Sequence, residues 1–311
     1  MKKILIPFLL LVALVISACS HESGSKEDTE PAEDKEKKIA DTITYESENG
    51  PIEVPADPKR VVVLSSFIAG SVMALDVNIV GVDSWAKASK RFEPYLKNAQ
   101  EVSDESLEKI IELEPDLIIA ASTNKNLDKL GEIAPTVTYT YGNVDYLTQH
   151  IELGKLFNKE KEAREWVDDF KKRAEQAGKD IKAKIGEDAT VSVIESYDKQ
   201  LSVFGDNWGR GTEILYQEMK LSMPEKVKEM ALKEGYYALS PEVLPEYAGD
   251  YIVLSSNGAD NSFKETETYK NIPAVKNNRV FEANAAEFYF NDPVTLDYQL
   301  DFFLDSFLNS K

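Results

Sequence analysis

The stretch Phe204–Gly211, with the sequence FGDNWGRG, carries the side chains best suited to binding a ligand. Trp208 offers a large flat apolar face with one N–H donor, and Arg210 is a permanent cation with a planar fork of donors. Three glycines allow sharp bends and a close backbone approach. The helical pattern that begins near Thr212 adds free N–H groups and a positive dipole end, which favour an anion. The stretch therefore predicts a cleft for a flat, partly apolar, negatively charged ligand.

A purely structural interpretation of the same stretch stays open. A tryptophan in a turn often covers a core, and Arg210 would then pair with a nearby carboxylate such as Asp206. The two interpretations differ in their consequences. At the surface of a groove, Trp208 and Arg210 contribute affinity and little stability to the ligand-free protein. In a structural role they contribute stability and no affinity.

The chain begins with the layout of an export signal. Lys2 and Lys3 precede an apolar run, Ile4–Ile16, which is too short to span a bilayer comfortably, and Ser17-Ala18 then precede Cys19. We predict a signal peptide over residues 1–18 and acylation of Cys19, which is the single cysteine of the chain. The alternatives are an uncleaved anchor and a simple secretory signal. Acyl chains on Cys19 would hold the protein on the outer face of the membrane without a transmembrane helix.

The residues that follow have the composition of a tether. Residues 19–41 are crowded with charge and lack apolar periodicity, so we predict a lipid-anchored flexible segment in which His21 is solvated. With no second cysteine, no internal disulfide is available and stability must come from a core. The chain has a formal net charge of -19, which argues against a nucleic-acid partner.

About 270 further residues alternate between apolar strands and helices. This pattern indicates parallel sheets covered on both faces. Between the two halves in which strands and helices alternate lies a helical stretch without strands. His150 falls on an apolar face of this stretch, so we expect it to be a packed core residue. The predicted fold is α/β, with two Rossmann-like lobes joined by a long rigid helix. We predict the N-terminal lobe over residues 42–157, the linking helix over residues 158–187 and the C-terminal lobe over residues 188–311.

Several phrases together resemble the binding proteins of iron-siderophore ABC transporters. They are the lipoprotein cysteine Cys19, EPDLII at Glu114–Ile119, FGDNWGRG at Phe204–Gly211, YAGDYI at Tyr247–Ile252 and the aromatic cluster at Phe288–Pro293. The likeness extends from Thr42 to Phe307. Asn207–Gly211 most resembles the ferric-hydroxamate (FhuD-like) branch of Gram-positive bacteria. The resemblance implies a two-lobed protein of the class III periplasmic-binding-protein type, with little hinge motion and a shallow groove between the lobes.

The resemblance also implies roles for individual residues. The ligand-binding set comprises Trp208, Arg210, Phe290, Tyr289, Trp85 and Arg91, with Lys90 as a further source of positive charge. Phe290 stands where some relatives have tyrosine, and Ser202 stands where an aromatic residue is expected. Glu108 and Glu242, one in each lobe, match the acidic residues that dock onto permease arginines, although from the sequence alone they are ordinary solvated charges.

The implied cargo is a ferric siderophore of hydroxamate or citrate-hydroxamate type. Fe(III) is a hard cation satisfied by six oxygens, all of which a siderophore supplies, so no intrinsic cofactor or protein metal ligand is expected. The expected partners are an ABC-transporter permease with its ATPase and, through the lipid, the cell membrane of a Gram-positive bacterium. A monomer is expected.

Other functions stay open as alternatives. A catecholate complex, a corrinoid or heme is a possible ligand, with Tyr197, Tyr289 and Tyr298 as candidate heme ligands. A surface enzyme acting on a siderophore is a distant alternative, because no Gly-x-Ser-x-Gly, His-Glu-x-x-His or thiol-pair motif occurs. We therefore expect a binding protein and not an enzyme.

Overall fold

The computed structural model describes residues 42–258 and 261–309, which belong to one compact unit that begins at residue 40. The predicted signal peptide, Cys19 and the tether lie outside the described residues. Within the described part of the chain, no helix combines the length and the apolar character needed to cross a membrane.

The described chain starts with an antiparallel hairpin of β1 (Thr42–Ser47) and β2 (Gly50–Pro55). Tyr45 from this hairpin is buried, and its hydroxyl lies 3.0 Å from that of Tyr139. The hairpin is thereby attached to the sheet that follows.

The first sheet has the strand order β5-β4-β3-β6-β7, and every neighbouring pair is parallel. Its four longer strands are rich in the β-branched and apolar residues that favour interior strands, whereas β5 and α2 are short and contain no apolar run. The strands are β3 (Val61–Leu64), β4 (Ile79–Val82), β5 (Gln100–Glu101), β6 (Leu117–Ala121) and β7 (Thr136–Tyr139), and the helices between them are α1 (Ser66–Ala74), α2 (Ser84–Ala88), α3 (Leu107–Glu112) and α4 (Leu127–Ile133).

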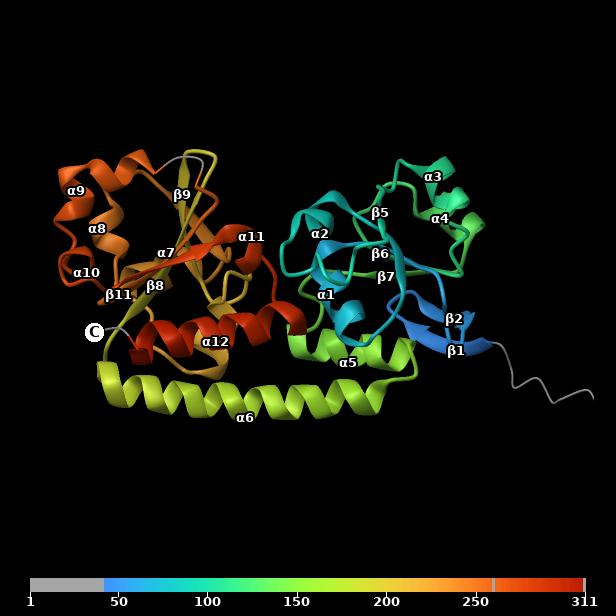
Figure 1. Cartoon of the computed structure of the whole chain (residues 1–311), viewed down its shortest axis with the longest axis horizontal. Helices are drawn as coiled ribbons and strands as arrows, with labels where there is room; N and C mark the ends of the chain where they lie inside the picture. Colours follow the sequence, from blue (N-terminus) through green and yellow to red (C-terminus); the bar gives the residue numbers. More distant parts are fainter. Residues whose placement is uncertain (1–41, 259–260, 310–311) are drawn as a thin grey trace, which may run out of the picture. The chain divides into compact units, whose positions relative to one another are not determined.

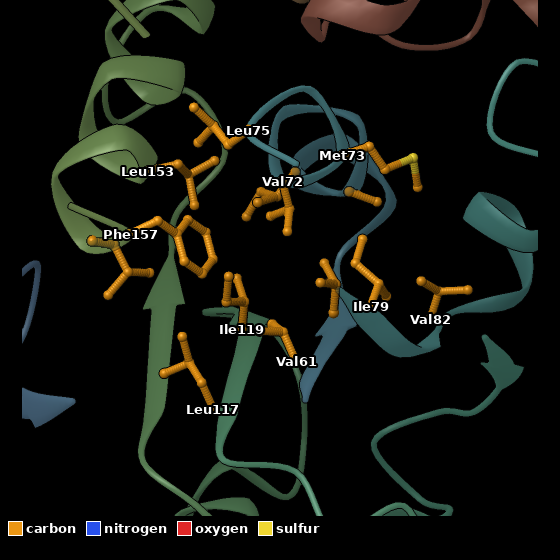
Figure 2. Close-up of a cluster of buried hydrophobic side chains, with 14 of the residues drawn as sticks. Val61, Val72, Met73, Leu75, Ile79, Val82, Leu117, Ile119, Leu153 and Phe157 are labelled. Atoms are coloured by element: carbon orange, nitrogen blue, oxygen red, sulfur yellow. The ribbon is translucent and has the colours of Figure 1, made fainter. Parts of the chain in front are cut away.

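A dry core covers one face of this sheet (Figure 2). Val61 and Ile119 come from neighbouring strands, Val72 from α1, and Leu153 and Phe157 from α5 (Tyr146–Leu156) and its C-terminal end. All five side chains are buried, and large apolar side chains of this kind contribute on the order of 2 kcal/mol each.

The second sheet has the order β10-β9-β8-β11-β12 and is mixed, not wholly parallel. The pairs β8–β11 and β11–β12 are parallel, whereas the pairs β8–β9 and β9–β10 are antiparallel. The strands are β8 (Val191–Tyr197), β9 (Gln200–Phe204), β10 (Tyr236–Leu239), β11 (Tyr251–Ser256) and β12 (Val280–Asn284). The short helices are the π-helical turn η1 (Glu213–Glu218), α7 (Glu225–Ala231), α8 (Leu244–Tyr247), the 3-10 turn η2 (Ser262–Glu265), α9 (Glu267–Lys270), α10 (Pro273–Lys276) and α11 (Ala285–Phe288).

The long helix α6 (Glu160–Ile185) runs for 26 residues between the two sheets in sequence and packs against α5 and α12 (Pro293–Asn309) (Figure 1). Its buried residues, among them Val167, Phe170 and Ala174, recur every three or four positions, as one apolar stripe requires. The fold is therefore α/β with a long connecting helix, as predicted. The lobe limits 42–157, 158–187 and 188–311 stay a prediction.

The C-terminal helix α12 also packs against α1 of the first sheet's layer. Gly70 in α1 allows this approach, because a Cβ atom there would lie 1.9 Å from a carboxylate oxygen of Asp292. Asp292 is buried just before α12, where it accepts hydrogen bonds from the backbone N–H and the hydroxyl of Thr295. Burial raises the pKa of Asp292 to about 6. The chain thus returns to the first sheet after completing the second.

Candidate functional site

A groove of about 1050 Å³ opens at the carboxyl ends of β3, β4, β6 and β7. Segments that directly follow these strands line it, together with residues from the second half of the chain. Parallel α/β sheets commonly bind ligands at this edge, where the strand order reverses. Its lining includes Phe67, Asp83, Ser84, Trp85, Tyr141, Asp145, Asn207, Trp208, Arg210, Glu213 and Asn291.

Aromatic rings form one wall of the groove. The ring centroid of Tyr141 lies 4.8 Å from that of Phe67 and 6.0 Å from that of Trp208. The Tyr141 hydroxyl donates to the carbonyl oxygen of Asn207 at 3.1 Å, which links the two halves of the wall. Burial raises the pKa of Tyr141, so its hydroxyl stays protonated as a donor. Trp208 lines the groove and keeps 37% of its surface exposed.

Sequence reasoning missed Phe67 and Tyr141 as site residues. The available signal was their position, since Phe67 follows the buried strand β3 and Tyr141 follows β7. Residues that follow parallel strands reach the binding edge of a sheet. The strand-like run Thr136–Tyr141 extends to Tyr141 in the sequence, so the sequence alone places this residue within the strand and hides its position after it.

The glycines of the FGDNWGRG stretch serve the packing of the chain. Gly209, Arg210 and Gly211 adopt φ angles of 70°, 58° and 82°, a left-handed run that side chains disfavour. A Cβ atom on Gly209 would lie 2.2 Å from the carbonyl oxygen of Tyr289, and one on Gly211 would lie 2.5 Å from the Phe303 ring. Chain atoms, and not a ligand, therefore account for the close approach at these two glycines.

Arg210 lies at the groove but is held from behind by a buried carboxylate. Its Nε and Nη2 donate to the two oxygens of Glu195, both at 3.1 Å, and Nη1 donates to the carbonyl oxygen of Trp208. The two charged side chains are only 11% and 7% exposed. The guanidinium carbon also lies 4.9 Å from the ring centroid of Phe204 and 5.1 Å from that of Tyr289. The acid that pairs with Arg210 is thus Glu195 and not Asp206.

The predicted anion site at the start of the helix after Gly211 is wrong. The chain's own Glu213 occupies this position and is buried. Its carboxylate accepts hydrogen bonds from the Gly209 backbone N–H at 2.9 Å, the Asn291 amide at 2.8 Å and the Thr212 hydroxyl at 3.0 Å. Burial raises the pKa of Glu213, although these hydrogen bonds oppose the increase. The helix itself is one π-helical turn, a form often found at functional sites.

Two residues predicted to contact the ligand, Phe290 and Arg91, reach neither the groove nor the smaller cavity beside it. Phe290 is 1% exposed and stacks on Phe92 with ring centroids 5.2 Å apart, in the core of the first sheet. Its burial follows from the return of the chain into that core ahead of α12. Arg91 pairs with Glu287 at 2.8 Å and lies over the ring of Tyr298, so its charge is already engaged.

Of the other predicted aromatic residues, Trp85 lines the groove and Tyr289 lines only the smaller cavity beside it. Trp85 is 48% exposed at the start of α2, and its ring centroid lies 5.3 Å from that of Tyr289. Ser202 lies in β9, paired across the sheet with Glu195, so no aromatic side chain extends from that position. Lys90 is exposed in the loop after α2 and lines neither the groove nor the smaller cavity beside it.

The remaining predicted residues lie away from the groove. Glu108 is exposed in the first turn of α3, and Glu242 is exposed just before α8. His150 is buried, as predicted, with its ring 5.3 Å from that of Trp166. No group of three or more acidic, histidine or cysteine side chains suited to a metal ion occurs within residues 42–258 and 261–309.

Comparison with known proteins reveals extensive similarity. Residues 61–286 match the family described as periplasmic binding protein. The chain is 35% identical over 306 residues to the iron(3+)-hydroxamate-binding protein FhuD of Bacillus subtilis, and this alignment covers 96% of this chain and 95% of that protein. It is 36% identical over 317 residues to YxeB, an iron(3+)-hydroxamate-binding protein of the same organism, and this alignment covers 98% of this chain and 97% of YxeB. FhuD2 from Staphylococcus aureus with bound ferrioxamine B superimposes with a TM-score of 0.77 at 36% identity, covering 81% of this chain and 99% of that one.

Proposed function

We propose that this chain, which belongs to the periplasmic binding protein family, captures a ferric hydroxamate siderophore outside the cytoplasm and delivers it to an ABC-transporter permease. Its family and its relatives are substrate-binding proteins and not enzymes. The observation that carries the proposal is the aromatic-walled groove with Arg210 at its edge, in a chain similar along nearly its whole length to hydroxamate-binding proteins.

The chemistry of the groove suits a preformed iron complex. The siderophore supplies the six oxygens that Fe(III) requires, so the protein has only to recognise the organic shell and the outer faces of those oxygens. Phe67, Tyr141 and Trp208 offer apolar faces for the shell. Aromatic and apolar side chains of this kind are typical walls of concave small-molecule sites.

Arg210 supplies the polar contact in this proposal. Glu195 and the Trp208 carbonyl use three of its N–H groups, and a guanidinium has five, so two remain for ligand oxygens. The pair with Glu195 fixes the direction of the fork. A planar donor of fixed orientation matches the coplanar oxygens of a hydroxamate better than a mobile ammonium does.

The charge of the groove favours hydroxamates over strongly anionic complexes. Asp83, Asp145 and Glu213 line it, and the positive charge of Arg210 is balanced by Glu195. A catecholate complex carries several negative charges and would meet no uncompensated arginine among the residues that line this groove. For heme, the candidate ligand Tyr298 lies beneath Arg91, away from the groove.

The finer features of the proposal concern anchoring and delivery. We infer that acyl chains on Cys19 hold the protein at the outer face of a Gram-positive cell membrane, with residues 19–41 as the tether. We further infer that the protein acts as a monomer and that Glu108 and Glu242 contact the permease. The exposure of both carboxylates, far apart in sequence, supports a docking role.

A fluorescence titration tests the proposed ligand. The chain has three tryptophans, and a ferric complex in the groove should quench Trp208. We expect saturable quenching by a ferric trihydroxamate, weaker quenching by ferric citrate and none by a ferric tricatecholate. A Trp208→Phe variant should lose part of the quenching, because Trp85 also lines the groove, and it should keep most of the affinity, because phenylalanine retains an apolar ring. Saturable binding of the tricatecholate alone would refute the hydroxamate assignment.

A further inference from the structure

A second cavity of about 230 Å³ lies next to the groove. Ser84 and Trp85 line both spaces, so the two adjoin at the start of α2. The other residues that line this side pocket include Tyr197, at the end of β8, and Tyr289, just after α11. Its walls thus come from three elements that are far apart in the sequence.

Three aromatic rings surround the side pocket. The ring centroid of Tyr289 lies 5.3 Å from that of Trp85 and 6.5 Å from that of Tyr197, at interplanar angles of 45° and 76°. Trp85 is 48% exposed and Tyr197 is 44% exposed. Rings that are this exposed add little to the core, so packing alone does not explain why they converge. Inclined aromatic faces around a small space form the arrangement that binds alkylammonium groups.

The electrostatics of the side pocket also favour a cation. Arg210 lies on the ring of Tyr289, but its charge is balanced by the buried carboxylate of Glu195. Asp83 directly precedes the shared residues Ser84 and Trp85, and its Oδ2 is buried without a hydrogen-bond partner. Burial, with the nearby Glu195, raises the pKa of Tyr289 to about 12, so its ring stays neutral. The protein's net charge of -19 adds a general preference for cations.

We propose that the side pocket binds the alkylammonium end of a linear siderophore whose iron centre occupies the groove. This inference rests on the proposed function and adds a second point of recognition to it. A linear trihydroxamate has a free chain beyond its last iron-binding group, whereas a macrocyclic one does not. The pocket would therefore discriminate between ligands that present the same iron centre.

Three ferric trihydroxamates test the proposal. They are a linear one that ends in a primary ammonium, its N-acetylated derivative and a macrocycle without a tail. Tyr197 is the residue to change, because it lines the side pocket but not the groove. Since a cation–π contact at a partly exposed site has a modest energy, Tyr197→Leu should weaken the ammonium ligand about three- to tenfold. The same variant should bind the macrocycle within about twofold of the wild-type protein.

Two further variants serve as controls. Tyr197→Phe keeps the ring and should retain the affinity for the ammonium ligand. Tyr95→Leu removes an aromatic residue that is 52% exposed and lines neither cavity, so it should change nothing. Equal melting temperatures of the variants would show that folding is intact.

The possible outcomes separate this inference from the proposed function. If the wild-type protein bound none of the three complexes, the proposed function itself would fail. If it bound the macrocycle and the ammonium ligand, and Tyr197→Leu left both affinities unchanged, the side pocket would have no role. An equal loss for the acetylated and the ammonium ligands would also overturn the assignment, because the pocket would then recognise a chain and not its charge.

Discussion

Replacing Arg210 by alanine should destabilise the ligand-free protein as well as weaken ligand binding. The side chains of Arg210 and Glu195 are 11% and 7% exposed, and they share two hydrogen bonds of 3.1 Å. Removing the arginine leaves the Glu195 carboxylate buried without its counter-ion. Breaking a buried pair in this way costs about 3–5 kcal/mol of unfolding free energy. From the sequence alone, Arg210 is expected at the groove surface, where its removal would cost almost no unfolding free energy.

The affinity should fall in the same variant. A charge-assisted hydrogen bond to the ligand contributes about 1.5–3 kcal/mol, which corresponds to roughly a 10- to 100-fold weaker complex. Arg210→Lys should recover only part of it, since an ammonium has no planar fork. Urea denaturation and fluorescence titration on the same samples measure the two effects separately.

A double-mutant cycle tests the physical cause of the destabilisation. Glu195→Gln removes the charge with little change of shape, so the double variant Glu195→Gln/Arg210→Ala should recover at least about 1 kcal/mol relative to Arg210→Ala alone. Arg173→Ala is the matched control, because Arg173 is 39% exposed and its ion pairs should contribute no more than about 1 kcal/mol. An Arg210→Ala protein that unfolds at the wild-type urea concentration would refute the reasoning from the buried pair.

Three further outcomes are expected. Glu108→Ala and Glu242→Ala should leave the affinity for the ferric complex unchanged and reduce uptake by cells, because exposed charges act on association with a partner. A tenfold loss of affinity in either purified variant would instead show that the residue contacts the ligand. Cys19→Ala should abolish acylation, which mass spectrometry of the membrane fraction detects, and a normally lipidated variant would contradict the anchor. Burial lowers the pKa of His150 to about 4, whereas the unfolded value is about 6.5. Between these two values the unfolded chain binds one more proton than the folded protein. The unfolding free energy should therefore fall by on the order of 3 kcal/mol as the pH falls from 6.5 to 4. Urea titrations across this range should show a shallower pH dependence for His150→Leu, and identical slopes would contradict the buried neutral imidazole.

Local patterns determined the architecture because burial imposes them directly on the sequence. The apolar run at Val61–Leu64 has to be an interior strand, and the recurrence of Val167, Phe170 and Ala174 requires one buried helix face. The likeness of Asn207–Gly211 to the hydroxamate-binding branch also needed no coordinates. β5, with two residues, and α2, with five, escaped prediction because neither contains an apolar run or enough positions for a helical period to appear.

Only the tertiary structure decided which side chains meet. Glu195 and Arg210 are brought together by the pairing of β8 with β9, and Phe290 is withdrawn into the first sheet's core by the return of the chain ahead of α12. Tyr141 joins the site through a hydrogen bond to Asn207, 66 positions away. A sequence specifies which residues can bury, pair or bind. Partners so distant along the chain are selected by packing and by the need to neutralise each buried charge, and these conditions exist only in the folded protein.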